Sequence, residues 1–188
     1  MERRRWGSPY VPFVYQDVQY TLAHLNTFEH TYIQPASGAK PERLFTVIID
    51  FSDHCFTRGW KEGDDAALHY GPHKSRPQDE RTFDIQRWQL SHDLPNIVKG
   101  LMGAKLYHNR DRDDTKIHVT LTSQEAIEVE YEIYVNVRFD RSARRLRLTV
   151  ESAFWRSKGQ SNRRSSNRVS FALLLANAEI GKPVRRAP

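Results

Sequence analysis

The feature that most constrains the fold is a long alternation of apolar and polar residues in the second half of the chain. Between residues 128 and 139 every second residue is apolar, from Val129 to Phe139. After a polar stretch the alternation resumes, with Leu146 and Phe154 as its first and last apolar members. A period of two is typical of a half-buried β-strand. The two runs therefore predict one long antiparallel hairpin.

The register of this hairpin also follows from the pattern. If both apolar sets share one face, a symmetric loop centred on residues 142 and 143 places Val137 opposite Leu148 and Arg138 opposite Arg147. Like charges on directly opposed residues repel each other. The pairing therefore needs either screening by solvent, which we favour, or an anion bound nearby.

Shorter runs predict further strands at residues 28–33, 44–51 and 116–121. The run at 44–51 is continuously apolar, as expected for a central strand buried on both faces. Residues 169–175 fit either a final strand or a buried helical turn. We therefore predict an α+β fold, with an antiparallel sheet of about five or six strands and helices packed on one face.

One segment has the features of an amphipathic helix that begins at Ser91. Ser91 is a good N-cap, and Pro95 lies in the first turn, where its missing N–H costs little. The apolar positions recur at helical spacing and form one stripe: Leu94, Ile97, Val98 and Leu101. A second helix is predicted from Asp17 to Leu25.

The length of 188 residues fits a single domain spanning residues 1–188. Loose loops are expected near residues 59–82 and 156–168, followed by a basic C-terminal tail. No run approaches the roughly 20 apolar residues that span a bilayer. The single cysteine, Cys55, excludes an internal disulfide. We expect a cytoplasmic protein with no membrane partner.

Positive charge is concentrated near the C-terminus. Residues 138–188 carry thirteen Lys/Arg against three acids, a net charge of +10, whereas residues 1–137 carry a net charge of −4. Such asymmetry indicates an acidic partner, either nucleic acid or an acidic protein surface. A solvated basic loop and tail is the alternative. The candidate binding residues are Arg147, Arg156, Lys158, Arg163, Arg164 and Arg168.

The polar segment 53–58 directly follows the predicted buried strand, a position where folds often place reactive groups. His54 could transfer protons, Arg58 could hold a phosphate, and Cys55 could be a nucleophile if its pKa were lowered. A metal-independent ribonuclease would use His54, Glu151 and Arg58 as its catalytic set. The alternatives are a structural histidine and a buried, inert cysteine.

We expect neither a metal nor another cofactor. His54, Cys55, His69 and His73 include one H-x3-H spacing, but the last two histidines lie in a stretch rich in Gly and Pro. Zinc sites usually show paired short spacings or histidines on one helix face. The spacing is therefore insufficient to predict a metal site.

The segment 89–94 resembles the Gln-Leu-x-x-x-Leu peptides by which bacterial proteins dock on the replication sliding clamp. Gln89, Leu90 and Leu94 match that pattern, whereas His92 stands where an aliphatic residue is preferred. Leu94 also belongs to the apolar stripe of the predicted helix. Docking would therefore require this turn to detach from the core.

Three stretches together resemble a known family: FSDHCFTR at 51–58, RWQLSHDLP at 87–95 and VESAF at 150–154. They resemble bacterial stationary-phase growth adaptation proteins, to which the SocB-type toxins of SocA/SocB toxin–antitoxin pairs are similar. The resemblance implies a growth-inhibiting toxin that binds the sliding clamp, with an antitoxin protein as its partner.

The leading hypothesis is therefore a toxin that inhibits replication by binding the clamp or nucleic acid rather than by catalysis. A metal-independent ribonuclease toxin and a nucleic-acid-binding accessory protein are the alternatives. An enzyme should bring His54 and Glu151 close to an arginine. Clamp docking requires the segment 89–94 to be exposed. A charged binding face requires arginines that internal carboxylates do not neutralise.

Overall fold

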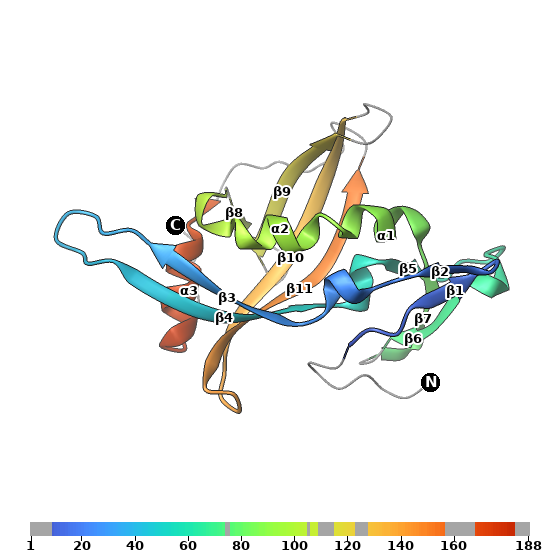
Figure 1. Cartoon of the computed structure of the whole chain (residues 1–188), viewed down its shortest axis with the longest axis horizontal. Helices are drawn as coiled ribbons and strands as arrows, with labels where there is room; N and C mark the ends of the chain where they lie inside the picture. The colour runs from blue at the N-terminus through green and yellow to red at the C-terminus, as the bar shows by residue number, and fades with distance from the viewer. Residues whose placement is uncertain are drawn as a thin grey trace.

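A computed structural model of the chain describes residues 9–73, 76–104, 106–108, 115–122, 128–156 and 168–182. Its main element is a seven-stranded sheet, with helices alongside (Figure 1). In spatial order its strands are β12 (Arg168–Val169), β8 (Leu106–His108), β9 (Thr115–Thr122), β10 (Glu128–Asp140), β11 (Arg145–Arg156), β4 (Arg43–Phe51) and β3 (Phe28–Gln34). The predicted α+β class is confirmed.

The sheet is mixed rather than purely antiparallel. β11 pairs in parallel with β4, with Leu146 beside Val47 and Val150 beside Phe51, while all other neighbouring strands of this sheet are antiparallel. A parallel pair needs a long crossover connection. The chain between β4 and β11 supplies it, and the short-range alternation of the sequence carries no signal for such a distant pairing.

The long hairpin formed by β10 and β11 has the predicted register between its turn and the pair Val135–Val150. Val137 lies opposite Leu148, and Arg138 lies opposite Arg147. Beyond this point Val135 pairs with Val150 but Tyr134 pairs with Ser152, so the register shifts by one residue. Glu151 is the extra residue of this β-bulge, so Phe154, which the alternation placed on the face of Leu146, lies on the opposite face across from Glu132. Bulges redirect side chains and are frequent beside functional sites.

The helices differ from the prediction in their boundaries. α1 (Ile85–Ser91) begins after Asp84, whose side chain accepts the backbone N–H of Arg87 at 3.0 Å, and α2 (Leu94–Lys99) follows directly. Ser91 is therefore the last residue of α1 and not a helix N-cap. Its hydroxyl donates to the Trp88 carbonyl at 2.6 Å. The predicted stripe nevertheless packs inward, since Leu94, Val98 and Leu101 are fully buried.

Two further local predictions are wrong. Residues 17–25 form no α-helix but contribute β2 (Val18–Tyr20), which pairs with β1 (Phe13–Tyr15), and the 3-10 turn η1 (Ala23–Leu25). The predicted loop 59–82 holds most of a second sheet, β5 (Thr57–Gly59), β6 (His69–His73) and β7 (Arg76–Phe83), in the order β5-β7-β6. Irregular pairing between β6 and β7 removes the simple period of two.

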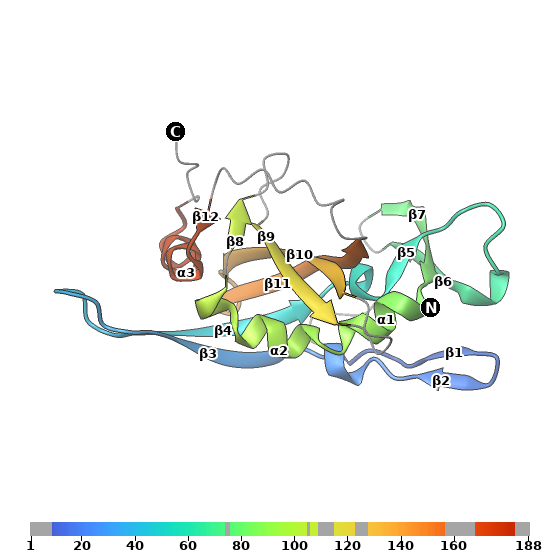
Figure 2. The same ribbon diagram turned by 90° about the horizontal axis from the view of Figure 1, so that it is seen from above.

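Both α2 and α3 (Phe171–Glu179) cover the same face of the large sheet. The Tyr32 hydroxyl donates to the Val98 carbonyl at 2.7 Å, and the Tyr32 ring meets the Phe171 ring edge-on at 4.8 Å. Residues 169–175, which the sequence left undecided, thus contribute mainly to a helix. Figure 2 shows α1 and α2 in sequence along one side of the large sheet.

The smaller sheet joins the body through aromatic contacts. The ring of Phe83 in β7 stacks on Phe13 at 4.3 Å and lies 6.1 Å from Phe56. Three remaining 3-10 turns are η2 (Asp53–Cys55), η3 (Ala66–Leu68) and η4 (Leu101–Gly103). Among the described residues, no helix has the length and apolar character needed to cross a membrane.

Candidate anion-binding site

The turn η2 is fixed where β4 leaves the large sheet. The Ser52 backbone N–H donates to the Val150 carbonyl of β11 at 2.9 Å, and the Cys55 thiol faces the same oxygen at 3.6 Å. The Ser52 hydroxyl caps the turn by accepting the N–H of His54 at 3.2 Å. His54 is thus held beside the strand that carries the bulged Glu151.

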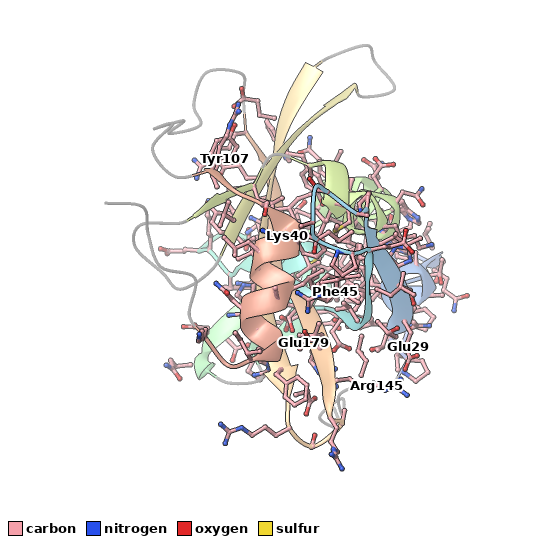
Figure 3. The ribbon with its side chains drawn as sticks, turned by 90° about the vertical axis from the view of Figure 1, so that its left-hand side faces the viewer. Glu29, Lys40, Phe45, Tyr107, Arg145 and Glu179 are labelled. Carbon is pink, nitrogen blue, oxygen red and sulfur yellow. The ribbon has the colours of Figure 1, made fainter. Side chains whose placement is uncertain are left out.

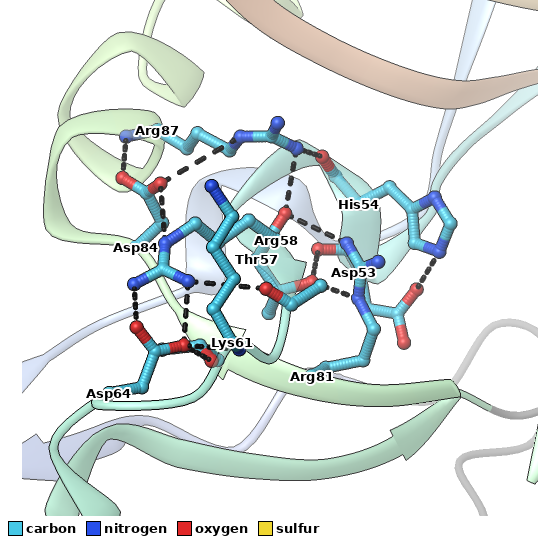
Figure 4. A network of polar contacts seen from close by, with 11 residues as sticks. Asp53, His54, Thr57, Arg58, Lys61, Asp64, Arg81, Asp84 and Arg87 are labelled. Atoms are coloured by element: carbon cyan, nitrogen blue, oxygen red, sulfur yellow. Dashed lines mark hydrogen bonds and ion pairs between the residues drawn. The ribbon is translucent and has the colours of Figure 1, made fainter. Parts of the chain in front are cut away.

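Three arginines from β5, β7 and α1 gather behind this turn (Figure 4). Arg81 donates from Nε to the Thr57 hydroxyl at 3.1 Å and from Nη2 to the Thr57 carbonyl at 2.9 Å. Arg87 donates from Nη1 to that same carbonyl at 2.8 Å and to the His54 carbonyl at 3.2 Å. Two guanidinium groups therefore share one neutral oxygen.

Within the described part of the chain, no carboxylate comes within hydrogen-bond distance of Arg81 or Arg87. The carboxylate of Asp84 stays 3.9 Å from Nε of Arg87, and Asp53 acts on Arg81 only at longer range. Burial lowers the pKa of both guanidinium groups, and the charge of Arg87 lowers that of Arg81 further. Because arginine stays protonated at neutral pH, this pair is a concentration of poorly compensated positive charge.

Arg58, the residue that the sequence proposed for holding phosphate, has different surroundings. Its two Nη atoms each donate to Asp64 at 2.7 Å, and Asp84 lies 3.7 Å away. The hydrogen bond to Asp64 raises the pKa of Arg58, and the same bond lowers the pKa of Asp64 well below its usual range. Its charge is already matched, so Arg81 and Arg87 are the better anion-binding candidates.

His54 and Glu151, the two proton-transfer candidates, lie on adjacent elements. His54 keeps 32% of its side chain exposed, and its Nε2 lies 4.0 Å from the Asp53 carboxylate. Glu151 is exposed on the bulge, and its charge reaches Cys55, the residue after His54. The structure thus places a histidine next to Arg87 and brings the strand of Glu151 alongside.

Cys55 is a structural residue. It is fully buried, and burial raises the pKa of its thiol, with the charges of Asp53 and Glu151 adding to the effect. A nucleophilic cysteine needs a lowered pKa and access to solvent. The nucleophile hypothesis is therefore wrong, and the alternative of a buried, inert thiol holds.

A buried hydroxyl lies close to this region. Tyr131 is fully buried, and its hydroxyl has no hydrogen-bond partner within the described segments. Burial raises its pKa, and the charges of Cys55 and Arg87 act on it. An unsatisfied buried polar group costs about 1–3 kcal/mol, so this part of the core is not optimised for stability alone.

On the basic hairpin, by contrast, two of the candidate arginines are paired with internal carboxylates. Arg147 pairs with both Asp50 and Asp140, and Arg156 lies 3.0 Å from the buried Glu132 carboxylate. These carboxylates, rather than solvent or a bound anion, explain how Arg147 tolerates Arg138 on the opposite strand. The sequence-based preference for solvent screening is corrected accordingly.

The remaining basic candidates divide into two groups. Arg168 lies exposed on β12. Lys158, Arg163 and Arg164 fall outside the described residues. Arg145, on the same hairpin as Arg147, pairs with Glu29, and Figure 3 shows the two side chains close together.

The segment proposed to dock on a sliding clamp is only partly accessible. Gln89 is exposed and Leu90 is half-buried on α1, but Leu94 is fully buried at the start of α2. Leu94 packs in the core, as the apolar stripe predicted. Docking through all three positions would require the start of α2 to leave the core.

No group of three or more metal-ligating side chains occurs among the described residues. His69, one of the histidines considered for zinc, instead lies 2.7 Å from Glu80 through its Nε2. The side chain of His73 falls outside the described set.

Comparison with known proteins identifies the family. A family model described as the YjaZ family matches residues 12–179, which is most of the chain, and the protein belongs to that family. The matched range includes η2, Arg81, Arg87 and Glu151. No curated protein and no solved structure gives a significant match.

Proposed function

We propose that the protein binds a phosphate group of RNA at Arg81 and Arg87 and cleaves the RNA without a metal, acting as a growth-inhibiting toxin. The observation that carries the proposal is the Thr57 carbonyl, which both guanidinium groups share at 2.8 and 2.9 Å beside His54. Two concentrated and poorly compensated cations attract an anion, and arginine matches the oxygens of phosphate.

The chemistry uses groups of this chain alone. The Glu151 carboxylate takes the proton of a 2′-hydroxyl, whose oxygen attacks the adjacent phosphorus. The bond from phosphorus to the 5′-oxygen of the next nucleotide breaks, and protonated His54 donates a proton to that oxygen. The products are a 2′,3′-cyclic phosphate and a 5′-hydroxyl. Arg81 and Arg87 stabilise the charge on the non-bridging oxygens.

Toxicity rests on the sequence resemblance at residues 51–58, 87–95 and 150–154. The stretches 51–58 and 150–154 meet in space, because Ser52 donates to the Val150 carbonyl. The stretches that carry the resemblance thus include the η2 turn with His54 and the bulge with Glu151, on which the proposed chemistry depends. An antitoxin protein remains the expected partner.

The test uses purified protein and single-stranded RNA, with inorganic phosphate as a competing anion. Arg81→Gln and Arg87→Gln should each weaken phosphate binding by about 10- to 150-fold, the range for hydrogen bonds to charged groups. Arg145→Gln is the matched control, because Arg145 is half-exposed and paired with Glu29. It should leave binding and cleavage unchanged.

Arg81 and Arg87 also hold the turn, so folding of each variant is checked by circular dichroism and thermal unfolding. Glu151→Gln separates binding from chemistry. It should keep phosphate binding and lower the cleavage rate by about 100-fold or more, the usual share of one proton-transfer group. A wild-type protein that neither binds phosphate nor cuts RNA would overturn the proposal.

A binding toxin is the second candidate, favoured by the exposed Gln89 on α1. Inducible expression in a bacterium distinguishes the two mechanisms. Early loss of RNA integrity supports cleavage, whereas arrested DNA synthesis with intact RNA supports sliding-clamp blockade. In the latter case Gln89→Ala should restore DNA synthesis, while Arg87→Gln should not. Nucleic-acid binding without growth inhibition would support the accessory-protein alternative.

A further inference from the structure

An aromatic pair lies next to the arginine site, on the face of the hairpin opposite the core. Phe154 of β11 and Tyr134 of β10 stack with ring centroids 5.7 Å apart and an angle of 20° between their planes. Tyr134 pairs with Ser152, and Phe154 pairs with Glu132, so both rings belong to the same side of the two strands. Both side chains are half-buried, so part of each stays at the surface.

Arg87 contacts both the aromatic pair and the arginine site. The guanidinium carbon of Arg87 lies 5.4 Å from the centroid of the Phe154 ring, while its Nη1 donates to the carbonyls of His54 and Thr57. Arg156 approaches the same ring, at 5.0 Å. The aromatic pair and the proposed phosphate site are therefore adjacent, and Arg87 contacts both.

The aromatic pair is held in place by a carboxylate on the same face of the hairpin. Glu132 is 1% exposed, and its Oε2 accepts the Tyr134 hydroxyl at 3.0 Å and lies 3.0 Å from Nε of Arg156. One buried carboxylate thus orients both the ring of Tyr134 and the cation over Phe154. A prearranged surface loses less conformational entropy when a ligand binds.

We propose that a nucleobase stacks on the Phe154–Tyr134 pair, so that the ligand of this site is an unpaired nucleotide of single-stranded RNA. The inference rests on the proposed function, because it assumes a phosphate at Arg81 and Arg87. Bases stack on aromatic rings and on arginine planes with little dependence on sequence, since every base has a π-face. Bases within a duplex are already stacked, so a single strand is the matching ligand.

The experiment compares the affinities of ribose 5-phosphate and of adenosine and uridine 5′-monophosphates by calorimetry. The wild-type protein should bind the nucleotides about 5- to 150-fold more tightly than ribose 5-phosphate, the range measured for one stacked base. Phe154→Leu should abolish that advantage without weakening ribose 5-phosphate. Phe154→Tyr keeps an aromatic ring and should keep the advantage, which controls for misfolding.

The outcomes separate this inference from the proposal beneath it. One outcome is that ribose 5-phosphate and the nucleotides bind equally well and that Arg87→Gln weakens the binding of both. This outcome would overturn the stacking but support the phosphate site. An undiminished advantage in Phe154→Leu would also overturn the stacking. Failure of every probe to bind the wild-type protein would overturn the phosphate site, and the stacking with it.

Discussion

Arginines in two regions of the molecule have opposite surroundings. On the basic hairpin, Arg145, Arg147 and Arg156 each pair with a carboxylate. Behind the η2 turn, Arg81 and Arg87 donate to carbonyl and hydroxyl oxygens that carry no charge. Three arginines from the region with the larger excess of positive charge are thus compensated by carboxylates, whereas two arginines from the region of net negative charge are poorly compensated.

The difference teaches that a net charge counted along the sequence does not locate an anion site. Residues 1–137 carry a net charge of −4, and they supply Glu29, Asp50 and Glu132, which pair with three arginines of the hairpin. Charge asymmetry along a chain is a statement about its whole field. Local binding depends on which cations keep unmatched charge after folding.

The largest expected effect is on stability, at Arg147. Arg147→Ala leaves Asp50, which is 1% exposed, as a buried charge that still accepts a hydrogen bond from the Thr27 hydroxyl at 2.5 Å. Removing one partner of a buried ion pair costs about 3–5 kcal/mol. The free energy of unfolding in urea should fall by that amount, while phosphate affinity of the folded protein stays unchanged.

Arg145→Ala is the matched control, because its pair with Glu29 is half-exposed. It should change the unfolding free energy by less than about 1 kcal/mol. If Arg147→Ala instead weakens phosphate binding and leaves the unfolding free energy unchanged, the contrast between the paired hairpin arginines and the arginine site is wrong.

A smaller effect is expected at the Arg58–Asp64 ion pair, in which the two charges match although it lies beside the poorly compensated Arg81 and Arg87. The pKa of Asp64 is lowered in the folded protein, chiefly by its hydrogen bond with Arg58. Its ionised form therefore favours folding above about pH 4, the unfolded value, and this contribution diminishes as the pH falls further.

Asp64→Asn should accordingly flatten the loss of stability below pH 4, measured as the midpoint of thermal unfolding against pH. It also leaves Arg58 with Asp84 at 3.7 Å as its nearest carboxylate, which adds unmatched charge to the site. Phosphate affinity should rise slightly. An unchanged acid profile in this variant would show that the ion pair does not form in solution.

The smallest effect is expected at Tyr131. Tyr131→Phe removes a buried hydroxyl that has no partner within the described segments, so the unfolding free energy should stay constant or rise by up to about 1 kcal/mol. A marked loss of stability would instead reveal a hydrogen bond to a buried water. Cleavage should persist, because the hydroxyl lies inside the core and not at the surface.

Local patterns were sufficient to predict much of the sheet. The period of two predicted the β10–β11 pairing near the turn, including Val137 opposite Leu148, but not the bulge at Glu151 that moves Phe154 to the other face. The parallel contact between β4 and β11 lacks any such local signal. The strands β6 and β7 escaped prediction because their irregular pairing breaks the alternation.

The site was predicted only in part. The segment 53–58 was singled out, and His54 does lie beside a charged cluster. Arg81 lies in a stretch that the sequence predicts as a loop, and Arg87 precedes the segment 89–94 that resembles a docking peptide. Both arginines matter because they donate to the Thr57 carbonyl. Arg81 is 24 positions and Arg87 is 30 positions from Thr57 in the sequence, so no local pattern reveals these contacts.

The parallel contact between β4 and β11 also bears on the order in which the protein folds. The Cys55 thiol and the Val150 carbonyl that it faces are 95 residues apart in the sequence, whereas β10 and β11 are joined by a short turn. Contacts between distant residues form late, because a long loop must close first. Newly made chains should therefore acquire the hairpin early and the arrangement around His54 only in the final step, so that a half-folded molecule lacks the proposed site.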